Sequence, residues 1–216
     1  MRRMFTGIVR ALGRVSAIER NRTGARLLVA IPKGFRAARG DSVCVNGVCL
    51  TATVAGAGRL AFDLVKETLS RSNLGDLAAG APVNLEPSLT LRDALGGHFV
   101  MGHVDAVGTI ESKEPLGDGA ALRVKLPPEV ASMMAVKGSV ALDGVSLTLT
   151  EVGGGALGVA LIPFTLERTT LGSKGRGARV NIEVDVLARY VHAMVGGKRK
   201  DGGVSRDLLR KAGFLR

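Results

Sequence analysis

The chain has 216 residues, 46% of them hydrophobic, which is enough apolar material for a packed core in one large or two modest domains. Its formal net charge of +11 is scattered, with one concentration after Lys198, and aromatic residues make up only 3%, so base-stacking platforms for a nucleic-acid partner are lacking. No apolar run approaches the roughly 18 residues of a membrane span, and the apolar stretch after Met4 is too short for a signal peptide, so we expect a cytoplasmic protein with no membrane partner.

The first element in chain order is an apolar segment at Met4–Val15, MFTGIVRALGRV, which is partly repeated at Val100–Ile110 as VMGHVDAVGTI. The two lie 95 residues apart, and the repeat keeps Gly7, Val9 and Gly13 as Gly102, Val104 and Gly108. Self-similarity at a fixed spacing indicates a duplicated structural unit.

Short β-prone runs separated by turn residues follow. We expect strands at Arg26–Ile31, Ser42–Val45, Val48–Val54, Arg59–Val65 and Pro82–Glu86, with matching runs in the second half. Thr68–Asn73 and Thr165–Thr170 each predict one helical turn. Many short strands at regular spacing favour small closed barrels over a parallel sheet with crossover helices.

The clearest repeat is a predicted hairpin. Ser42–Thr53, SVCVNGVCLTAT, returns 97 residues later as Ser139–Thr150, SVALDGVSLTLT, with seven of twelve positions identical. Asn46-Gly47 and Asp143-Gly144 stand between the two β-prone runs of each copy. Such dipeptides tolerate the positive φ of a two-residue type I′ turn, so each copy predicts a tight hairpin.

Alternation along the strands sorts the hairpin side chains into two faces. Pairing Val45 with Val48 directs the valines and leucines toward a core. The opposite face holds Ser42, Cys44, Cys49 and Thr51 in the first copy and Ser139, Ala141, Ser146 and Thr148 in the second. One such face is typical of a half-exposed hairpin, whereas two with the same polar pattern favour a pair of binding sites. The two cysteines are expected to be thiols rather than a structural disulfide.

Further repeats indicate the domain organisation. Leu64–Gly75 returns as Leu161–Gly172 with six of twelve positions identical, and Val83–Glu86 returns as Val180–Glu183, both at an offset of 97. We therefore expect one domain at residues 1–96, a second at residues 97–185, and a separate C-terminal segment at residues 186–216.

The C-terminal segment has a different pattern. Leu187, Tyr190, Val191 and Met194 recur at helical spacing before Gly196-Gly197, which predicts an amphipathic helix. Because two barrels leave such a helix little to cover, we expect its apolar stripe to pack against other copies of the chain. A second short helix is predicted at Ser205–Lys211.

Few residues suit catalysis. Cys49 and Ser146 hold equivalent places, and each could be a nucleophile or a small polar contact to a flat ligand. His98 and His103 lack a third or fourth ligand at zinc-type spacing, so we expect buried, hydrogen-bonded histidines and no metal. Phosphate loops, dinucleotide fingerprints and serine-hydrolase elbows are missing from the sequence. Lys137, Asp143 and Asp185 could each be a surface or turn residue, or could each take part in a site.

Five motifs, in order and in register, together resemble one family. They are MFTGIV at Met4–Val9, NGVCLT at Asn46–Thr51, GGH at Gly96–His98 followed by GHVD at Gly102–Asp105, DGVSLT at Asp143–Thr148, and TLERTTLG at Thr165–Gly172. The set resembles the riboflavin synthase alpha-chain family of lumazine-binding proteins. The resemblance implies an all-β chain of two tandem six-stranded Greek-key β-barrels, plus a C-terminal oligomerisation helix that assembles a homotrimer.

The resemblance also implies a reaction. Members of the family are transferases that dismutate two molecules of 6,7-dimethyl-8-ribityllumazine without a metal or organic cofactor. A four-carbon unit passes from one molecule to the other, giving riboflavin and 5-amino-6-ribitylamino-pyrimidinedione. The N-terminal barrel of one subunit would meet the C-terminal barrel of a neighbour, and an association with a lumazine synthase stays open.

Residue roles follow from the same resemblance. Polar, nucleophilic or acid–base assistance would come from Cys49, Ser146, His103, Lys137, Asp143 and Asp185. Substrate would be bound by Phe5, Thr6, Ser42, Thr51, Lys66, Thr68, Asn84, Thr148, Ile162 and Thr165. A rival hypothesis keeps the fold without the reaction, as an antenna protein that binds a lumazine or flavin in one pocket. The intact second hairpin speaks against that rival.

Overall fold

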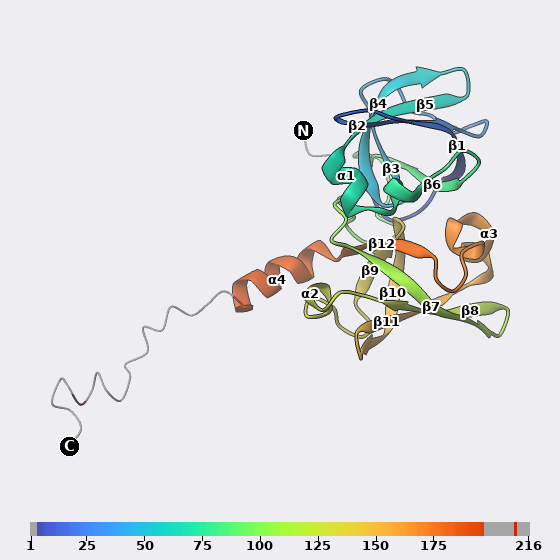
Figure 1. The fold of residues 1–216 in the computed structure, drawn as a ribbon. Helices are drawn as coiled ribbons and strands as arrows, with labels where there is room; N and C mark the ends of the chain where they lie inside the picture. Colours follow the sequence, from blue (N-terminus) through green and yellow to red (C-terminus); the bar gives the residue numbers. More distant parts are fainter. Residues whose placement is uncertain (1–3, 197–209, 211–216) are drawn as a thin grey trace.

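The computed structural model describes residues 4–196 and residue 210, and it contains two barrels with one helix projecting away from them (Figure 1). The first barrel consists of β1 (Ala11–Arg20), β2 (Gly24–Ala30), β3 (Ser42–Val45), β4 (Val48–Gly56), β5 (Arg59–Val65) and β6 (Pro82–Pro87). The second consists of β7 (Ala106–Leu116), β8 (Gly119–Lys125), β9 (Ser139–Leu142), β10 (Val145–Gly153), β11 (Ala156–Leu161) and β12 (Arg179–Val184).

Both barrels are closed and have the same topology. The strand order is β1-β2-β5-β4-β3-β6 in the first and, starting from the equivalent strand, β7-β8-β11-β10-β9-β12 in the second. All pairs are antiparallel, and the non-consecutive neighbours β2–β5 and β3–β6 are Greek-key connections. The predicted all-β fold with a duplicated six-stranded barrel is therefore confirmed.

The repeated hairpin forms in both barrels with the predicted register. Val45 pairs with Val48 and Cys44 with Cys49, and the second copy follows the same pattern. Asn46 and Asp143 both have a φ of 47°, and the glycine after each is also positive, as a type I′ turn requires. The valines and leucines of the hairpins are buried.

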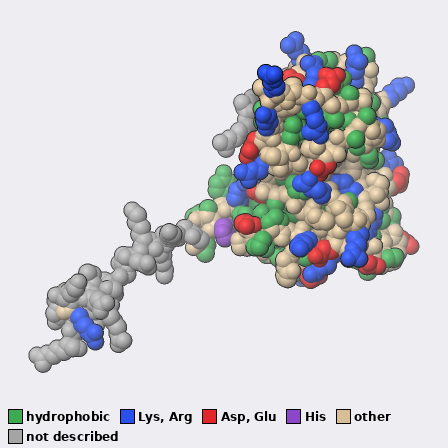
Figure 2. Space-filling view, viewed as in Figure 1, with side chains coloured by type: hydrophobic (Ala, Val, Ile, Leu, Met, Phe, Trp, Pro, Cys, Tyr) green, Lys and Arg blue, Asp and Glu red, His purple; other side chains and the backbone are tan. Residues whose placement is uncertain are grey.

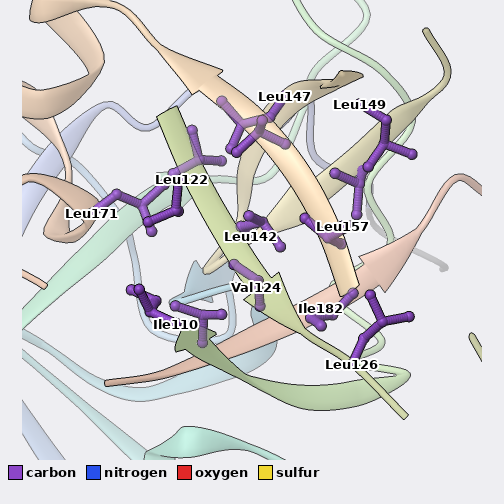
Figure 3. Close-up of a cluster of buried hydrophobic side chains, with 14 of the residues drawn as sticks. Ile110, Leu122, Val124, Leu126, Leu142, Leu147, Leu149, Leu157, Leu171 and Ile182 are labelled. Carbon is purple, nitrogen blue, oxygen red and sulfur yellow. The ribbon is translucent and has the colours of Figure 1, made fainter. Parts of the chain in front are cut away.

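Each barrel encloses its own apolar core. Leu27, Phe62 and Leu85 are buried in the first. In the second, Leu122, Leu142 and Leu157 come from three different strands and point toward one another (Figure 3). Burial of these side chains is the main favourable term in holding each barrel closed.

Short helical elements follow β5 and β11, as predicted. They are α1 (Lys66–Arg71) with the 3₁₀ turn η1 (Asn73–Asp76), and α3 (Pro163–Arg168) with η2 (Thr170–Gly172). The hydroxyl between the two parts, from Ser72 or Thr169, donates to a carbonyl four residues back and accepts an N–H two residues ahead. The sequence analysis missed α2 (Pro128–Ala131), a single turn that begins with a proline, which suits a first helical turn.

The predicted C-terminal helix is present as α4 (Val186–Gly196). Asp185 Oδ1 accepts the N–H of Leu187 at 2.9 Å, and Arg189 Nη2 donates to Asp105 Oδ2 of the second barrel at 2.9 Å. The stripe residues Leu187, Tyr190, Val191 and Met194 are exposed. The predicted helix at Ser205–Lys211 falls outside the described residues, apart from Arg210.

The surface of the described residues matches the scattered charge of the sequence. Figure 2 shows lysine and arginine side chains dispersed over both barrels on the visible face, rather than gathered in one patch. Within the described ranges, no helix has the length and apolar character needed to cross a membrane.

The segment that precedes each barrel crosses to the other barrel. Phe5 and Val100 exchange two backbone hydrogen bonds, of 2.8 and 3.1 Å, so the two segments meet as a short antiparallel bridge. Val9 then packs against the core of the second barrel, and Val104 packs against the core of the first. The repeat identified both valines, but this exchange was not predicted.

Candidate functional site

Cys49 on β4 and Ser146 on β10 occupy equivalent places on the outer faces of the two hairpins, and both are half-buried. Each is contacted by a crossing segment. The Cys49 N–H donates to the carbonyl of Gly102 at 2.9 Å, and the Ser146 N–H donates to the carbonyl of Gly7 at 2.8 Å. Each reactive side chain therefore lies beside backbone that leads into the opposite barrel.

Two buried glutamates, which the sequence analysis did not single out, hold the crossing segments. Glu183 on β12 accepts the N–H groups of residues 101–103 at 2.6, 2.9 and 3.0 Å. Glu86 on β6 accepts the N–H and the hydroxyl of Thr6, both at 2.7 Å, and the N–H of Gly7 at 3.0 Å. The repeated Val-Asn-x-Glu motif was visible in the sequence, but nothing in it indicated what would cover the carboxylates.

Burial raises the pKa of both carboxyl groups, because a charge is costly away from water. The pKa of Glu183 rises to about 7, opposed by its backbone hydrogen bonds and helped by nearby Asp105. The pKa of Glu86 also rises, opposed by the hydrogen bonds from Thr6 and Gly7 and by the charge of Arg10.

His98 forms a dyad with Ser146. Its Nδ1 lies 2.7 Å from Ser146 Oγ, and its Nε2 has no hydrogen-bond partner among the described residues. Burial lowers the pKa of His98, with Asp185 acting weakly in the opposite direction. A neutral imidazole in this position can accept the hydroxyl proton of Ser146.

The prediction of buried histidines is right for His98 and wrong for His103. His98 is buried and hydrogen-bonded, whereas His103 is exposed. The reason is that the backbone N–H of His103, rather than its ring, anchors the segment to Glu183. His103 nevertheless follows Gly102 directly, which places it beside the Cys49 hairpin.

The predicted residues of the first site lie on the first hairpin and on α1. Ser42 and Thr51 are a cross-strand pair on the same face as Cys49. Lys66 and Thr68 belong to α1, which follows the neighbouring strand. Ser42 is half-buried and lines a cavity of about 640 Å³.

The predicted residues of the second site have an equivalent placement. Thr148 is exposed on the Ser146 face of β10, and Thr165 is half-buried in α3. Ile162, just before α3, is 61% exposed, and Val65 at the equivalent place in the first barrel is also 61% exposed. An exposed apolar side chain thus stands at the end of the strand that pairs with β4 and, equivalently, of the strand that pairs with β10.

Phe5 and Thr6, predicted to shape a shared cavity, are both buried. Phe5 belongs to a small cluster between the barrels that includes Cys44 and Val100, with Cys49 packed against it. It therefore supports the Cys49 hairpin from the inter-barrel side.

Asn84 and Asp143 lie in a buried polar network between the barrels, which we call the seam. Asn84 donates to the carbonyl of Asp143 at 2.9 Å and accepts the N–H of Thr170 at 2.8 Å. Asp143 accepts Asn73 Nδ2 at 2.7 Å and the N–H of Asn181 at 2.8 Å. It also pairs with Lys174, so its carboxylate is fully engaged within the seam.

Lys137 and Asp185 lie at the edge of the second barrel. Lys137 is exposed, has a φ of 68°, and donates its backbone N–H to the carbonyl of Leu149 at 2.7 Å. Asp185 caps α4 and, with Ser139, lines a cavity of about 350 Å³ between α4 and the loop after α2. Neither is among the side-chain partners of Cys49 or Ser146 described above.

The outer faces of the hairpins are partly covered, since Cys44 and Ala141 are buried there while Cys49 and Ser146 stay half-buried. Four of the cavities among residues 4–196 have volumes of about 350 to 810 Å³, and neither Cys49 nor Ser146 lines any of these four. Within the same residues, no group of three histidine, cysteine or acidic side chains could hold a metal ion.

Comparison of the sequence with known proteins finds one domain family and several related enzymes. The sequence model of the Lumazine binding domain matches residues 6–88 and again residues 101–185. A riboflavin synthase of Mycobacterium tuberculosis is 46% identical over 197 residues, covering 89% of this chain and 98% of that protein. One of Actinobacillus pleuropneumoniae is 35% identical over 215 residues, covering 98% of this chain and all of that protein.

Solved structures show the same fold. LumP complexed with riboflavin has a TM-score of 0.79 at 24% identity, and LumP complexed with 6,7-dimethyl-8-(1'-D-ribityl) lumazine has a TM-score of 0.77 at 23% identity. Each covers 84% of this chain and 99% of its own.

Proposed function

The chain belongs to the lumazine-binding domain family and, within it, to the riboflavin synthases, and from this premise we propose how its two barrels carry out the reaction. Two molecules of 6,7-dimethyl-8-ribityllumazine react with each other. A four-carbon unit moves from one to the other, so that one leaves as riboflavin and the other as 5-amino-6-ribitylamino-pyrimidinedione.

The observation that carries this proposal is the matched pair of hairpin faces. Cys49 and Ser146 are equivalent by strand register, and each is contacted by an equivalent crossing segment. Two identical substrates need two similar sites, and holding their ring systems together supplies much of the rate enhancement.

The chemistry assigns different tasks to the polar groups. The 7-methyl group of one lumazine must lose a proton, and C7 of the other must receive a nucleophile. Because the ring delocalises the carbanion, modest bases suffice once hydrogen-bond donors fix the heterocycle. Cys49, Ser146 and His103 would give this assistance, and the His98–Ser146 hydrogen bond supports a basic role for the second site.

Binding would use the polar and apolar groups around each hairpin. In the first site these are Ser42, Thr51, Lys66 and Thr68, and in the second Thr148, Ile162 and Thr165. Asn84 and Asp143 would act indirectly, through the seam, and Lys137 and Asp185 from the edge of the second barrel.

The sites would be completed by a neighbouring chain in a homotrimer built on α4. Two observations support this assembly: Val65 and Ile162 are exposed at the ends of the strands that pair with β4 and β10, and the apolar stripe of α4 is uncovered. A cytoplasmic location and a lumazine synthase partner stay predictions from the sequence.

The direct test is to incubate the protein with the lumazine and record riboflavin fluorescence. We expect one riboflavin for every two lumazines consumed, without added metal or cofactor. Tight binding of the lumazine with no riboflavin formed would instead identify the antenna protein that the sequence analysis left as a rival.

A further inference from the structure

Each crossing segment has one anchor in each barrel. Residues 101–103 are held by Glu183 of the second barrel, while the carbonyl of Gly102 accepts the N–H of Cys49 in the first. Thr6 and Gly7 are held by Glu86 of the first barrel, while the carbonyl of Gly7 accepts the N–H of Ser146 in the second.

Each crossing segment packs directly against the backbone of the hairpin that it contacts. A Cβ placed on Gly102 would lie 2.6 Å from Cys49 Cβ, and one placed on Gly7 would lie 2.6 Å from Ser146 Cβ. Both glycines also have positive φ, of 74° and 75°. Because no side-chain atom separates the backbones, a shift of either segment moves the reactive hairpin position directly.

Given the proposed function, we propose that Glu86 and Glu183 are crossed positioning residues: each carboxylate, fixed on the last strand of one barrel, sets the reactive position of the other barrel. Glu183 thereby positions Cys49, and Glu86 positions Ser146. Each glutamate acts through three hydrogen bonds to the crossing segment.

A carboxylate suits this task better than an amide. The donors converge on both oxygens of each glutamate, and glutamine would turn its NH₂ group toward an N–H. When the group is ionised, its hydrogen bonds are also charge-assisted and about twice as strong as neutral ones. The charged group near Glu183 is Asp105 and the one near Glu86 is Arg10, while the thiol of Cys44, whose pKa burial raises, lies near both.

Thiol labelling tests the crossed relation without depending on turnover. In a Cys44→Ala background, Cys49 is the only cysteine, and its rate of reaction with a maleimide reports its position. A second reporter, Ser146→Cys with Cys44→Ala and Cys49→Ser, reports the other site. Each reporter is combined with Glu86→Gln and, separately, with Glu183→Gln.

We expect Glu183→Gln to change the labelling rate of Cys49 by about threefold or more and to leave the Ser146→Cys reporter within about 1.5-fold, with the reverse for Glu86→Gln. Equal effects of both variants on both reporters, or effects confined to a glutamate's own barrel, would overturn the proposal. A general loss of packing would move both reporters together, so the crossed pattern distinguishes positioning from damage.

Two further results complete the test. If a glutamine variant does not fold, as circular dichroism would show, Glu86→Asp and Glu183→Asp retain the charge on a shorter side chain and should give the same crossed pattern with smaller changes. In the otherwise unmodified protein, both glutamine variants should lower kcat more than they raise KM. If the labelling rates show the crossed pattern but the protein forms no riboflavin, the proposed function is wrong and the crossed positioning is still supported.

Discussion

Burial raises the pKa of Glu183 to about 7 from an ordinary value of 4.5, and this makes folding sensitive to pH. Between these values the folded protein binds a proton that the unfolded chain has released. The stabilising contribution is therefore complete below pH 4.5 and is lost as the pH rises through 7. The shift corresponds to about 3 kcal/mol at most.

Glu183→Gln should remove this dependence. The substitution carries a fixed cost from the mismatched hydrogen bonds, but that cost does not change with pH. The free energy of unfolding of the variant, relative to that of wild type, should therefore be about 2 kcal/mol more favourable at pH 8 than at pH 5. Urea unfolding at the two pH values measures it. Glu114→Gln, on the exposed end of β7, is the matched control and should track wild type at both pH values. Parallel curves for Glu183→Gln and wild type would contradict the buried titration.

His98→Gln should separate catalysis from packing at the second site. We expect kcat to fall by roughly 100-fold, because glutamine can hydrogen-bond to Ser146 but cannot take its proton. Adding Ser146→Ala should cost little more, since the two side chains act as one unit. Steady-state kinetics of the two single variants and the double variant provide the measurement, and fully additive losses would show that the dyad is not functional.

At the scale of elements, the contact between Gly102 and the Cys49 hairpin can be tested against a matched glycine. Gly34 has a φ of 97° and open space where a Cβ would stand, so Gly34→Ala measures the backbone cost alone, about 1–2 kcal/mol. Gly102→Ala should cost about 2 kcal/mol more, because its Cβ would overlap Cys49, and should also lower kcat. Thermal unfolding and turnover check both variants. Equal losses in the two would mean that the segment can move away freely.

The exposed stripe of α4 predicts an assembly that depends on this helix. Leu187→Glu combined with Met194→Glu should shift the molar mass measured by light scattering toward smaller species, because buried unpaired charges oppose packing. Leu116→Glu changes another exposed leucine, at the end of β7, and should leave the mass unchanged. An unchanged mass for the α4 variant would rule out the helix as the assembly element.

Local elements were predictable because their signals are local. The register of the β3–β4 hairpin follows from one dipeptide and the alternation beside it, and α4 follows from its helical period. The short α2 has no amphipathic repeat to reveal it. His103 was misjudged because its backbone, not its ring, makes the anchoring contact.

At the scale of the molecule, the repeat was enough to predict two like barrels, but not how they meet. Asn84 and Asp143 were assigned to the sites by resemblance, whereas the structure places their polar groups in the seam. Their partners, Asn73, Thr170 and Asn181, come from both halves of the chain. Contacts across such separations leave no pattern in a single sequence, and the same holds for Glu86 and Glu183.

Mixing two inactive variants tests whether each site is shared between chains. Cys49→Ala inactivates the site residue of the first barrel, and Ser146→Ala inactivates that of the second. If sites form between neighbouring subunits, co-refolding equal amounts should restore about one quarter of wild-type activity, because half the first barrels and half the second barrels are intact and pair at random. Each variant refolded alone is the control. A mixture as inactive as its components would place both halves of a site in one chain.

The crossed segments also impose an order on biosynthesis. Ser146, which Gly7 must meet, is synthesised 139 residues after it, roughly 7–28 s later at ordinary translation rates. Val104, by contrast, is synthesised just after the first barrel, against whose core it packs. The first barrel can thus receive Val104 early. The segment around Gly7 can be held by Glu86 and by backbone hydrogen bonds such as Leu89 N–H to the carbonyl of Met4, but it meets Ser146 only after the second hairpin has been synthesised.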